Sequence, residues 1–235
     1  LLNFKIIPVL WKSKYDYVII EGYHSISLLL AILTAKLSKK KVALRTEAYL
    51  DKSKPVLVRY FKEIYLRLVL PLFDLIFYSS DSAKKYYIHY GVKHNILVFV
   101  PAAVDNDFFR KQINILGNSQ DTIRNKLAIS KTTVIILGVG RITNRKNWKE
   151  LIDAFNVLRS KCNVALIIVG DGPDKKRLIE YVKLNKIGKV YFVGFKNQTE
   201  ISPYYHTSDI FALTSKYDPS PKVLNEALNF GLPLV

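Results

Sequence analysis

The sequence predicts an α/β fold made of two tandem, doubly wound parallel-sheet domains. Two observations carry this prediction: short apolar runs alternate with helix-like segments along the chain, and a polar, mixed stretch at 110–131 separates two such series. Apolar runs without alternation are typical of buried parallel strands, which need helical crossovers between them. We predict a first domain at 1–109, a linker at 110–131 with a short helix near 122–128, and a second domain at 132–235.

The second half shows the pattern more clearly. The run at 134–140 is continuously apolar and ends in glycine, as expected of a buried strand. Apolar residues in 146–161 then recur at helical spacing. The remaining predicted elements are a strand at 164–170, a helix at 174–187, a strand at 190–195, a helix at 201–208, a strand at 210–215, a helix at 221–230 and a strand from 232.

The first half repeats the alternation less completely. Its predicted strands are 15–20, 41–45, 75–79 and 96–100, and its predicted helices are 25–37, 55–73 and 82–90. The helix at 55–73 is basic and aromatic, with Arg59, Lys62 and Arg67 at helical spacing. We expect it to pack on its own domain, with contact to a membrane surface as the alternative. No apolar run approaches the roughly 20 residues that span a bilayer.

Composition narrows the functional classes. Hydrophobic residues make up 49% of the 235, which excludes a disordered or low-complexity chain. The single cysteine excludes a disulfide framework and indicates a reducing compartment. The formal net charge of +17 is spread over both halves, so we favour anionic small substrates or an anionic surface over nucleic acid. The chain contains no methionine, which predicts that it does not begin where translation begins.

The glycines after the first strand of the second domain suggest a phosphate site. Thr143 stands where a dinucleotide fingerprint needs its third glycine, so the NAD-type motif fails. Arg141 and Lys146 follow at the carboxyl end of the strand, where α/β sheets bind ligands. Two cations suit a diphosphate. An ordinary solvated basic loop explains them about equally well.

A second constellation lies at 215–227. Ser220 is a good N-cap and Pro221 a good first helical residue, so the helix start would direct free N–H groups toward the same edge. Lys222 adds a positive charge there. Glu226 lies one turn further on, and it either pairs with Lys222 or holds ribose hydroxyls.

In this order, the motifs resemble the donor domain of family 4 glycosyltransferases. The matching residues are Gly140-Arg141 with Lys146, Gly170-Asp171-Gly172-Pro173, Asp218 followed eight residues later by Glu226, and Ala227-Leu228 with Gly231-Leu232-Pro233. The first half is similar to the same family at Arg45-Thr46-Glu47 and from Pro101 to Phe109. Asp218 replaces the commoner glutamate, and no histidine stands near the end of the 41–45 strand, where family members often carry one.

The resemblance implies a GT-B enzyme with two Rossmann-like domains, both incomplete in this chain. It implies a retaining hexosyltransferase that needs no divalent metal and no cofactor and uses a nucleotide-diphosphate sugar. The acceptor would be a glycan or a lipid-linked acceptor, in polysaccharide or glycolipid biosynthesis in the cytoplasm, with the inner membrane surface as a further contact and no nucleic acid as partner. The implied donor-binding residues are Gly140, Arg141, Lys146, Gly170, Gly172, Ser220, Pro221, Lys222, Val223 and Glu226, and the implied catalytic residues are Asp218, Arg45 and Glu47.

Three alternatives stay open on the sequence alone. A nucleotide-sugar epimerase of the GT-B type shares the fold, although it would need further carboxylates and histidines in its cleft. A chain of this length could also bind a nucleotide and catalyse nothing. A regulatory or nucleic-acid-binding α/β protein that uses the positive charge is the non-enzymatic reading, and it would lose binding steeply with added salt.

Overall fold

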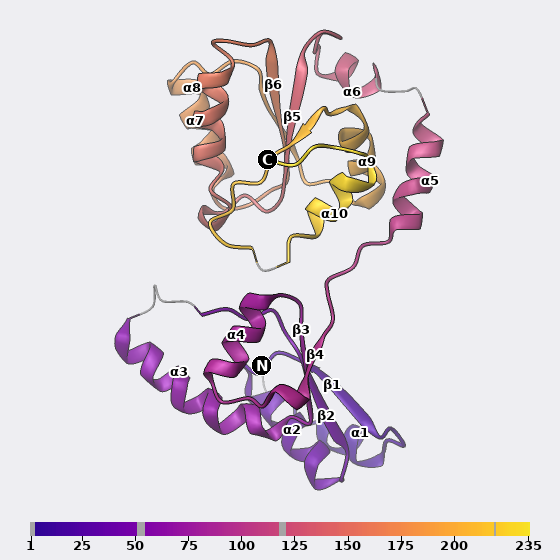
Figure 1. The fold of residues 1–235 in the computed structure, drawn as a ribbon, viewed down its shortest axis with the longest axis vertical. Helices are drawn as coiled ribbons and strands as arrows, with labels where there is room; N and C mark the ends of the chain where they lie inside the picture. The colour runs from indigo at the N-terminus through magenta and orange to yellow at the C-terminus, as the bar shows by residue number, and fades with distance from the viewer. Residues whose placement is uncertain (1–2, 51–54, 118–120, 219) are drawn as a thin grey trace. The chain divides into compact units, whose positions relative to one another are not determined.

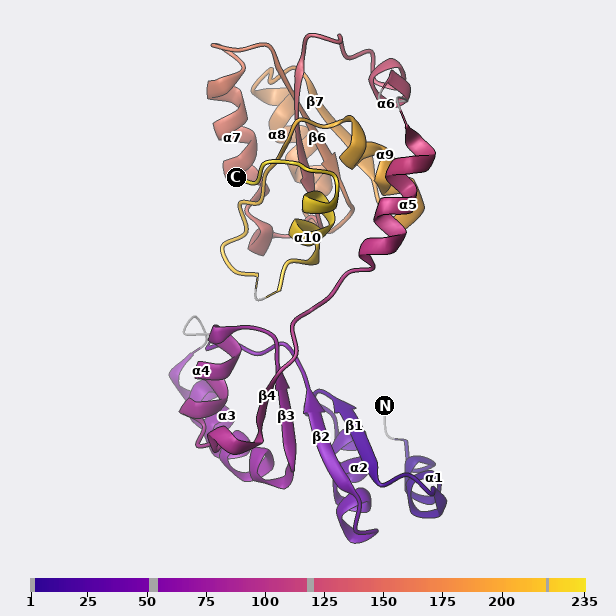
Figure 2. The same ribbon diagram turned by 45° about the vertical axis from the view of Figure 1, so that its right-hand side comes forward.

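The computed structural model describes residues 3–50, 55–117, 121–218 and 220–235 (Figures 1 and 2). The chain forms two compact units, Leu1–Ala102 and Ala103–Val235. Within the described residues, each unit holds one four-stranded sheet, and every strand pair is parallel. The prediction of two parallel-sheet α/β units is confirmed. The division falls after Ala102, whereas the sequence places the end of the first domain at 109.

In the first unit the strands follow chain order, β1-β2-β3-β4, so no reversal of strand order occurs among the described residues. Its core is one cluster, in which the buried strand residues Leu44 and Ile76 meet Leu66 and Tyr87 of two helices. The elements are α1 (Ile6–Lys12), β1 (Tyr17–Glu21), α2 (Ile26–Leu37), β2 (Lys41–Arg45), α3 (Val56–Val69), β3 (Leu75–Tyr78), α4 (Asp81–His89) and β4 (Leu97–Phe99).

Two helices of this unit differ from the prediction. Helix α1, which contacts α2, is not predicted, because its run of residues is apolar nearly all round and shows no helical period. Helix α3 ends at Val69 rather than at 73. Pro71 lacks an N–H and its ring clashes with an α-helical backbone, so the chain continues as a 3₁₀ turn at Leu70–Leu72. Within the described ranges, no helix combines the length and the apolar character needed to cross a membrane.

The second unit has the strand order β7-β6-β5-β8, which reverses beside β5. Figure 1 shows α7 and α8 on one side of this sheet and α9 and α10 on the other. Alternate residues of the central strands feed two separate cores, so Ile135 and Leu137 pack with α9 while Ile136 packs with α7. The elements are α5 (Asn106–Leu116), α6 (Asp121–Lys126), β5 (Val134–Val139), α7 (Trp148–Leu158), β6 (Val164–Val169), α8 (Lys175–Leu184), β7 (Val190–Gly194), α9 (Gln198–Thr207), β8 (Ile210–Phe211) and α10 (Lys222–Asn229).

The stretch predicted as a linker, 110–131, carries most of α5 and all of α6. Helix α5 contacts α9 and α10. Phe109 of α5 is fully buried, and its ring lies edge-on to Phe230 with 6.0 Å between centroids. The mixed composition of this stretch reflects an amphipathic helix with a narrow apolar face. Because that face packs on α9 and α10, α5 belongs to the second unit.

The last two predicted strands are shorter than expected. Strand β8 is limited to Ile210–Phe211, and the predicted strand at 232–235 is present as a single parallel bridge between Phe211 and Leu234. Beyond β8, the Leu213 N–H still donates to the Val235 carbonyl at 2.8 Å, and the Thr214 hydroxyl then donates to the backbone carbonyls of Lys146 and Asn147.

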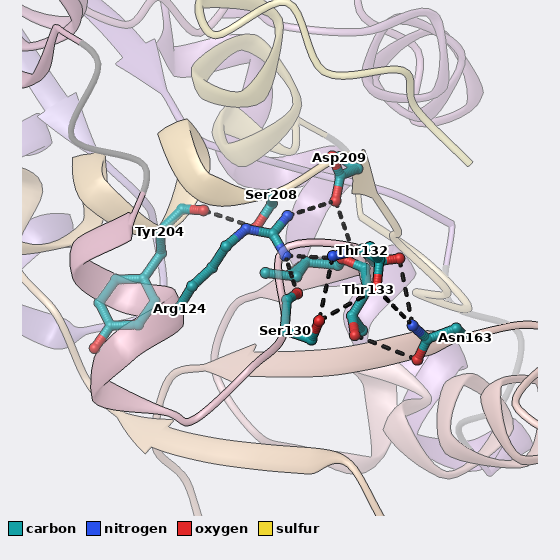
Figure 3. A network of polar contacts seen from close by, with 9 residues as sticks. Arg124, Ser130, Thr132, Thr133, Asn163, Tyr204, Ser208 and Asp209 are labelled. Atoms are coloured by element: carbon teal, nitrogen blue, oxygen red, sulfur yellow. Dashed lines mark hydrogen bonds and ion pairs between the residues drawn. The ribbon is translucent and has the colours of Figure 1, made fainter.

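A buried arginine holds the amino edge of the second sheet together (Figure 3). The Arg124 guanidinium of α6 donates to the carbonyls of Ser130 and Thr133, at 3.0 and 2.8 Å. It also pairs with the Asp209 carboxylate at 3.2 Å, and the same oxygen accepts the Ile135 N–H at 2.7 Å. One side chain thus joins α6, the start of β5 and the start of β8, at the edge opposite the strands' carboxyl ends.

The Arg124→Ala variant is expected to lower the free energy of unfolding by about 2–4 kcal/mol, because it leaves buried acceptors and a carboxylate without their donor. The exposed neighbour on the same helix provides the control, since Lys126→Ala should change the value by less than about 0.5 kcal/mol. Urea denaturation followed by circular dichroism measures both. Equal stability of the two variants would contradict the structural role of Arg124.

Candidate functional site

The loop after β5 carries the predicted Gly140, Arg141 and Lys146. Gly140 has a φ of +152°, a conformation that favours glycine. The Arg141 carbonyl accepts a 3.1 Å hydrogen bond from the indole of Trp148, which is buried under the loop. The backbone of Arg141 is therefore held in place while its side chain stays exposed.

The loop after β6 packs against this first loop through backbone alone. A Cβ on Gly170 would lie 2.0 Å from the carbonyl oxygen of Gly140, and a Cβ on Gly172 would lie 2.2 Å from that of Ile142. The Ile142 N–H donates to the Asp171 carbonyl at 2.8 Å. Gly170 and Gly172 are thus required for the close approach of the two loops.

Asp171 is tied to the start of α8. Its carboxylate accepts from Lys175 at 2.8 Å and from the Gly172 N–H at 2.7 Å. These two hydrogen bonds hold the pKa of Asp171 below its ordinary value. The carboxylate therefore stays charged and fixes the geometry of the loop.

The loop after β8 completes the site from the other side of the strand-order reversal. The Lys216 N–H donates to the Arg145 carbonyl at 3.0 Å. The side chains of Lys146 and Asp218 then form an ion pair, with only 11% and 12% of their areas exposed. A cation and a carboxylate from loops on both sides of the reversal meet at the carboxyl edge, the position where open α/β sheets bind ligands.

Helix α10 begins one residue later than the sequence predicts. Its first residue is Lys222, Pro221 occupies the N-cap position, and no side chain caps the helix, so the assignment of Ser220 as N-cap is wrong. Pro221 has a ψ of 91°, which is extended rather than helical, and this excludes it from the first turn. Lys222 is exposed, whereas Val223 packs against the core and not outward.

Glu226 has a partner that the sequence does not reveal. The hydroxyl of Tyr205 on α9 donates to its carboxylate at 2.8 Å. Burial and the adjacent Glu226 charge raise the pKa of Tyr205 well above its ordinary value, so the phenol stays protonated and keeps donating. The ring of Tyr205 stacks on Phe230 at 5.4 Å. The contact that orients Glu226 is thus this one from the core side, and not the i to i+4 pair with Lys222 considered above.

A cavity of about 390 Å³ opens beside the loops that follow β5, β6 and β7. Its lining is largely apolar and also includes the charged residues Arg141, Asp171 and Lys196. Phe195 and Lys196, which follow β7, belong to this wall and were not predicted as site residues. The sequence signal that could have identified them is an aromatic residue and a lysine directly after a glycine at the end of a predicted strand. The full lining is Val139, Gly140, Arg141, Val169, Gly170, Asp171, Phe195, Lys196 and Ile201.

The two predicted site residues of the first unit lie at the carboxyl end of β2. The Arg45 guanidinium is 3.9 Å from the Glu21 carboxylate, both side chains being exposed. Glu47 is also exposed. Between them, the Thr46 carbonyl accepts a 3.3 Å hydrogen bond from buried Tyr87. This edge of the first sheet therefore presents two charged side chains on a fixed backbone.

Comparisons with known proteins place these features in context. A sequence model described as "Glycosyl transferases group 1" matches residues 119–235. The amylovoran biosynthesis glycosyltransferase AmsD of Erwinia amylovora is 37% identical over 100 residues, covering 43% of this chain and 28% of that protein. The alpha-monoglucosyldiacylglycerol synthase of Acholeplasma laidlawii is 28% identical over 138 residues, covering 58% of this chain and 34% of that protein.

Among solved structures, HepE of Anabaena in complex with UDP matches with a TM-score of 0.76 at 20% identity, over 98% of this chain and 61% of that chain. HepE has also been crystallised with UDP-glucose. At this identity the likeness shows the fold, and it confirms the GT-B prediction. The chain spans less than two thirds of the length of each of these three proteins.

The close approach of the two loops leads to a prediction on stability. Gly172→Ala should lower the free energy of unfolding by about 2 kcal/mol or more, because the new Cβ overlaps the Ile142 carbonyl. Gly188→Ala is the control, because its Cβ would meet nothing nearer than an arginine nitrogen at 3.8 Å. That variant should change stability by less than about 1 kcal/mol. Urea denaturation measures the free energy of unfolding of both variants. Equal free energies for the two would contradict the argument that the two loops pack too closely for a side chain.

Proposed function

The chain belongs to the glycosyl transferases group 1 family, and from this premise we propose that the protein is a retaining, metal-independent glycosyltransferase. It moves a hexose-type sugar from a nucleotide-diphosphate sugar to a glycan or lipid-linked acceptor, in polysaccharide or glycolipid biosynthesis. The observation that carries the proposal is the pairing of Lys146 with Asp218 beside exposed Arg141, at the strand-order reversal of the second sheet. We place its work in the cytoplasm, at the inner membrane face.

Donor binding follows from the chemistry of the site. Arg141 offers a planar fork for phosphate oxygens, and Lys146 a compact charge, so together they suit a diphosphate. The carboxylate of Glu226, held by Tyr205, is an acceptor for ribose hydroxyls. The cavity next to Arg141 has the largely apolar lining that a nucleobase requires. The UDP and UDP-glucose in the HepE structures support a nucleoside diphosphate as the ligand class.

Transfer of the sugar requires stabilisation of charge. When the bond from the anomeric carbon to the diphosphate breaks, negative charge grows on the leaving group and positive charge on the sugar ring. Fixed cations at Arg141 and Lys146 stabilise the first, so the reaction needs no divalent metal. Asp218 forms an ion pair with Lys146. In this position it orients the Lys146 ammonium and provides a carboxylate near the sugar. Arg45 and Glu47 are proposed to act on the sugar or the acceptor.

Nucleotide binding tests the donor site. Glu226→Ala should raise the Kd for UDP by about 30-fold or more, because it removes a charged acceptor for ribose hydroxyls. Glu180→Ala, at an exposed position of α8, should leave the Kd unchanged. Isothermal titration calorimetry with UDP measures both. Unaltered affinity in the Glu226 variant would refute the proposed ribose contact.

Turnover tests the role of Asp218. Asp218→Asn keeps the shape of the side chain but removes its charge, so kcat should fall by about 100-fold or more while the donor KM changes far less. Asp107→Asn, an exposed aspartate on α5, should behave as the unaltered protein. Transfer of labelled sugar from UDP-sugars to a glycolipid extract provides the assay. A KM effect without a kcat effect would instead assign Asp218 to donor binding.

A further inference from the structure

Helix α3 has a second apolar face that points away from its own unit. The inner face packs through Leu66 and Val69, which are 0% and 5% exposed. A helix turns by 3.6 residues, so a spacing of four, three and four residues lines up side chains on one face. The outward stripe at that spacing consists of Leu57, Phe61, Ile64 and Leu68, which are 67%, 63%, 42% and 69% exposed.

The stripe has an aromatic neighbour and an arginine on its flank, and it belongs to a positively charged unit. Tyr60 lies beside it, 61% exposed, and its ring contacts that of Phe61 at 6.0 Å. Arg67 lies on its flank and reaches Glu63 on the same helix. Residues 1–102 contain 16 Lys and Arg against 7 Asp and Glu, a net charge of +9. An apolar stripe with aromatic and cationic neighbours on a positive unit is the pattern of a helix that lies in a lipid–water interface.

We propose that the outward face of α3, defined by Leu57, Phe61, Ile64 and Leu68, docks on an anionic lipid surface. Figure 1 shows α3 on one flank of the first unit, and the four stripe residues are exposed. Charge selects this occupant over a second copy of the chain. Two chains of +17 repel each other, whereas anionic headgroups attract basic residues by about 1 kcal/mol each near the surface.

The inner face of α3 links this surface to the carboxyl edge of the first sheet. The Tyr65 hydroxyl donates to the Tyr23 carbonyl, in the loop directly after β1. The Lys62 ammonium lies 5.2 Å from the ring centroid of Tyr86, whose hydroxyl pairs with that of Tyr23 at 2.7 Å. A docked α3 therefore holds the loop after β1 at a fixed place relative to the lipid. The consequence that a lipid-linked acceptor is presented to this edge rests on the proposed function; the docking itself does not.

Vesicle flotation tests the docking without any substrate. The 235-residue chain is mixed with vesicles of phosphatidylcholine alone or of phosphatidylcholine with phosphatidylglycerol. We expect flotation with the anionic vesicles, and weaker flotation in high salt. The triple variant Leu57→Ser, Phe61→Ser, Leu68→Ser should bind them at least about tenfold more weakly, because the apolar contact is lost.

The matched control is a second triple variant at equally exposed leucine and isoleucine positions on three other helices: Leu37→Ser, Ile115→Ser and Leu184→Ser. It should float like the unaltered chain. The single variant Phe61→Ser, expected to bind several-fold more weakly, keeps the test decisive if the stripe triple unfolds. Thermal unfolding of each variant shows whether it is folded. UDP binding separates the two proposals: if the unaltered chain does not bind UDP, the donor site is refuted, and flotation still tests the docking.

Three results would overturn the docking proposal. The first is an unaltered chain that does not float with anionic vesicles. The second is equal flotation of the stripe and control variants. The third is self-association in sedimentation velocity that the stripe variant abolishes, which would assign the face to a second copy of the chain.

Discussion

The candidate site depends on one steric constraint, the backbone-to-backbone approach of the loops after β5 and β6. Gly170 and Gly172 lie so close to the carbonyls of Gly140 and Ile142 that no side chain fits between them. This contact fixes where Arg141 and Lys146 leave the sheet. The loop after β8 then attaches to the same backbone through the Lys216 N–H, which brings Asp218 to Lys146. The glycines therefore place the backbone from which Arg141 and Lys146 leave the sheet, and the Asp218 carboxylate restricts the Lys146 side chain.

The pairing of Lys146 with Asp218 means that Lys146 contributes little to the positive electrostatic field of the chain. A buried cation with its own carboxylate adds little to the long-range field, and its partner restricts its position. The exposed Arg141, which lines the cavity, therefore adds a positive charge to the site that is not tied up in this pair. A ligand with two phosphates would bring its own negative charge to this arrangement and compete with Asp218 for the ammonium.

The sequence predicted the structure correctly where the physical cause of a pattern acts on the same residues that carry the pattern. Residues 135–139 of β5 are apolar because they are buried on both faces of the sheet, and Gly172 is a glycine because a carbonyl lies against it. It failed where the decisive partner is distant in the chain. Tyr205 orients Glu226 from 21 residues away, and the amphipathic α5 shows a polar composition until Phe109 is seen buried against Phe230. The N-cap position at Ser220 is a local rule that Pro221 overrides, because proline took an extended ψ and delayed the helix by one residue.

Helix α3 shows why the sequence alone left its role open between packing and surface contact. The structure confirms the packing, because Leu66 and Val69 are buried against the first unit, and it leaves a second apolar face exposed, which is the one proposed to dock on lipid. Leu66 and Val69 account for its attachment to the core, so the outward Leu57 and Phe61 have no folding role among the described residues. Exposed leucine and phenylalanine in a line raise the free energy of a chain in water, and a contiguous apolar stripe of this kind marks an interaction site. The positive charge around it then limits the partner to one that is negative and apolar at once, which is the chemistry of an anionic bilayer surface.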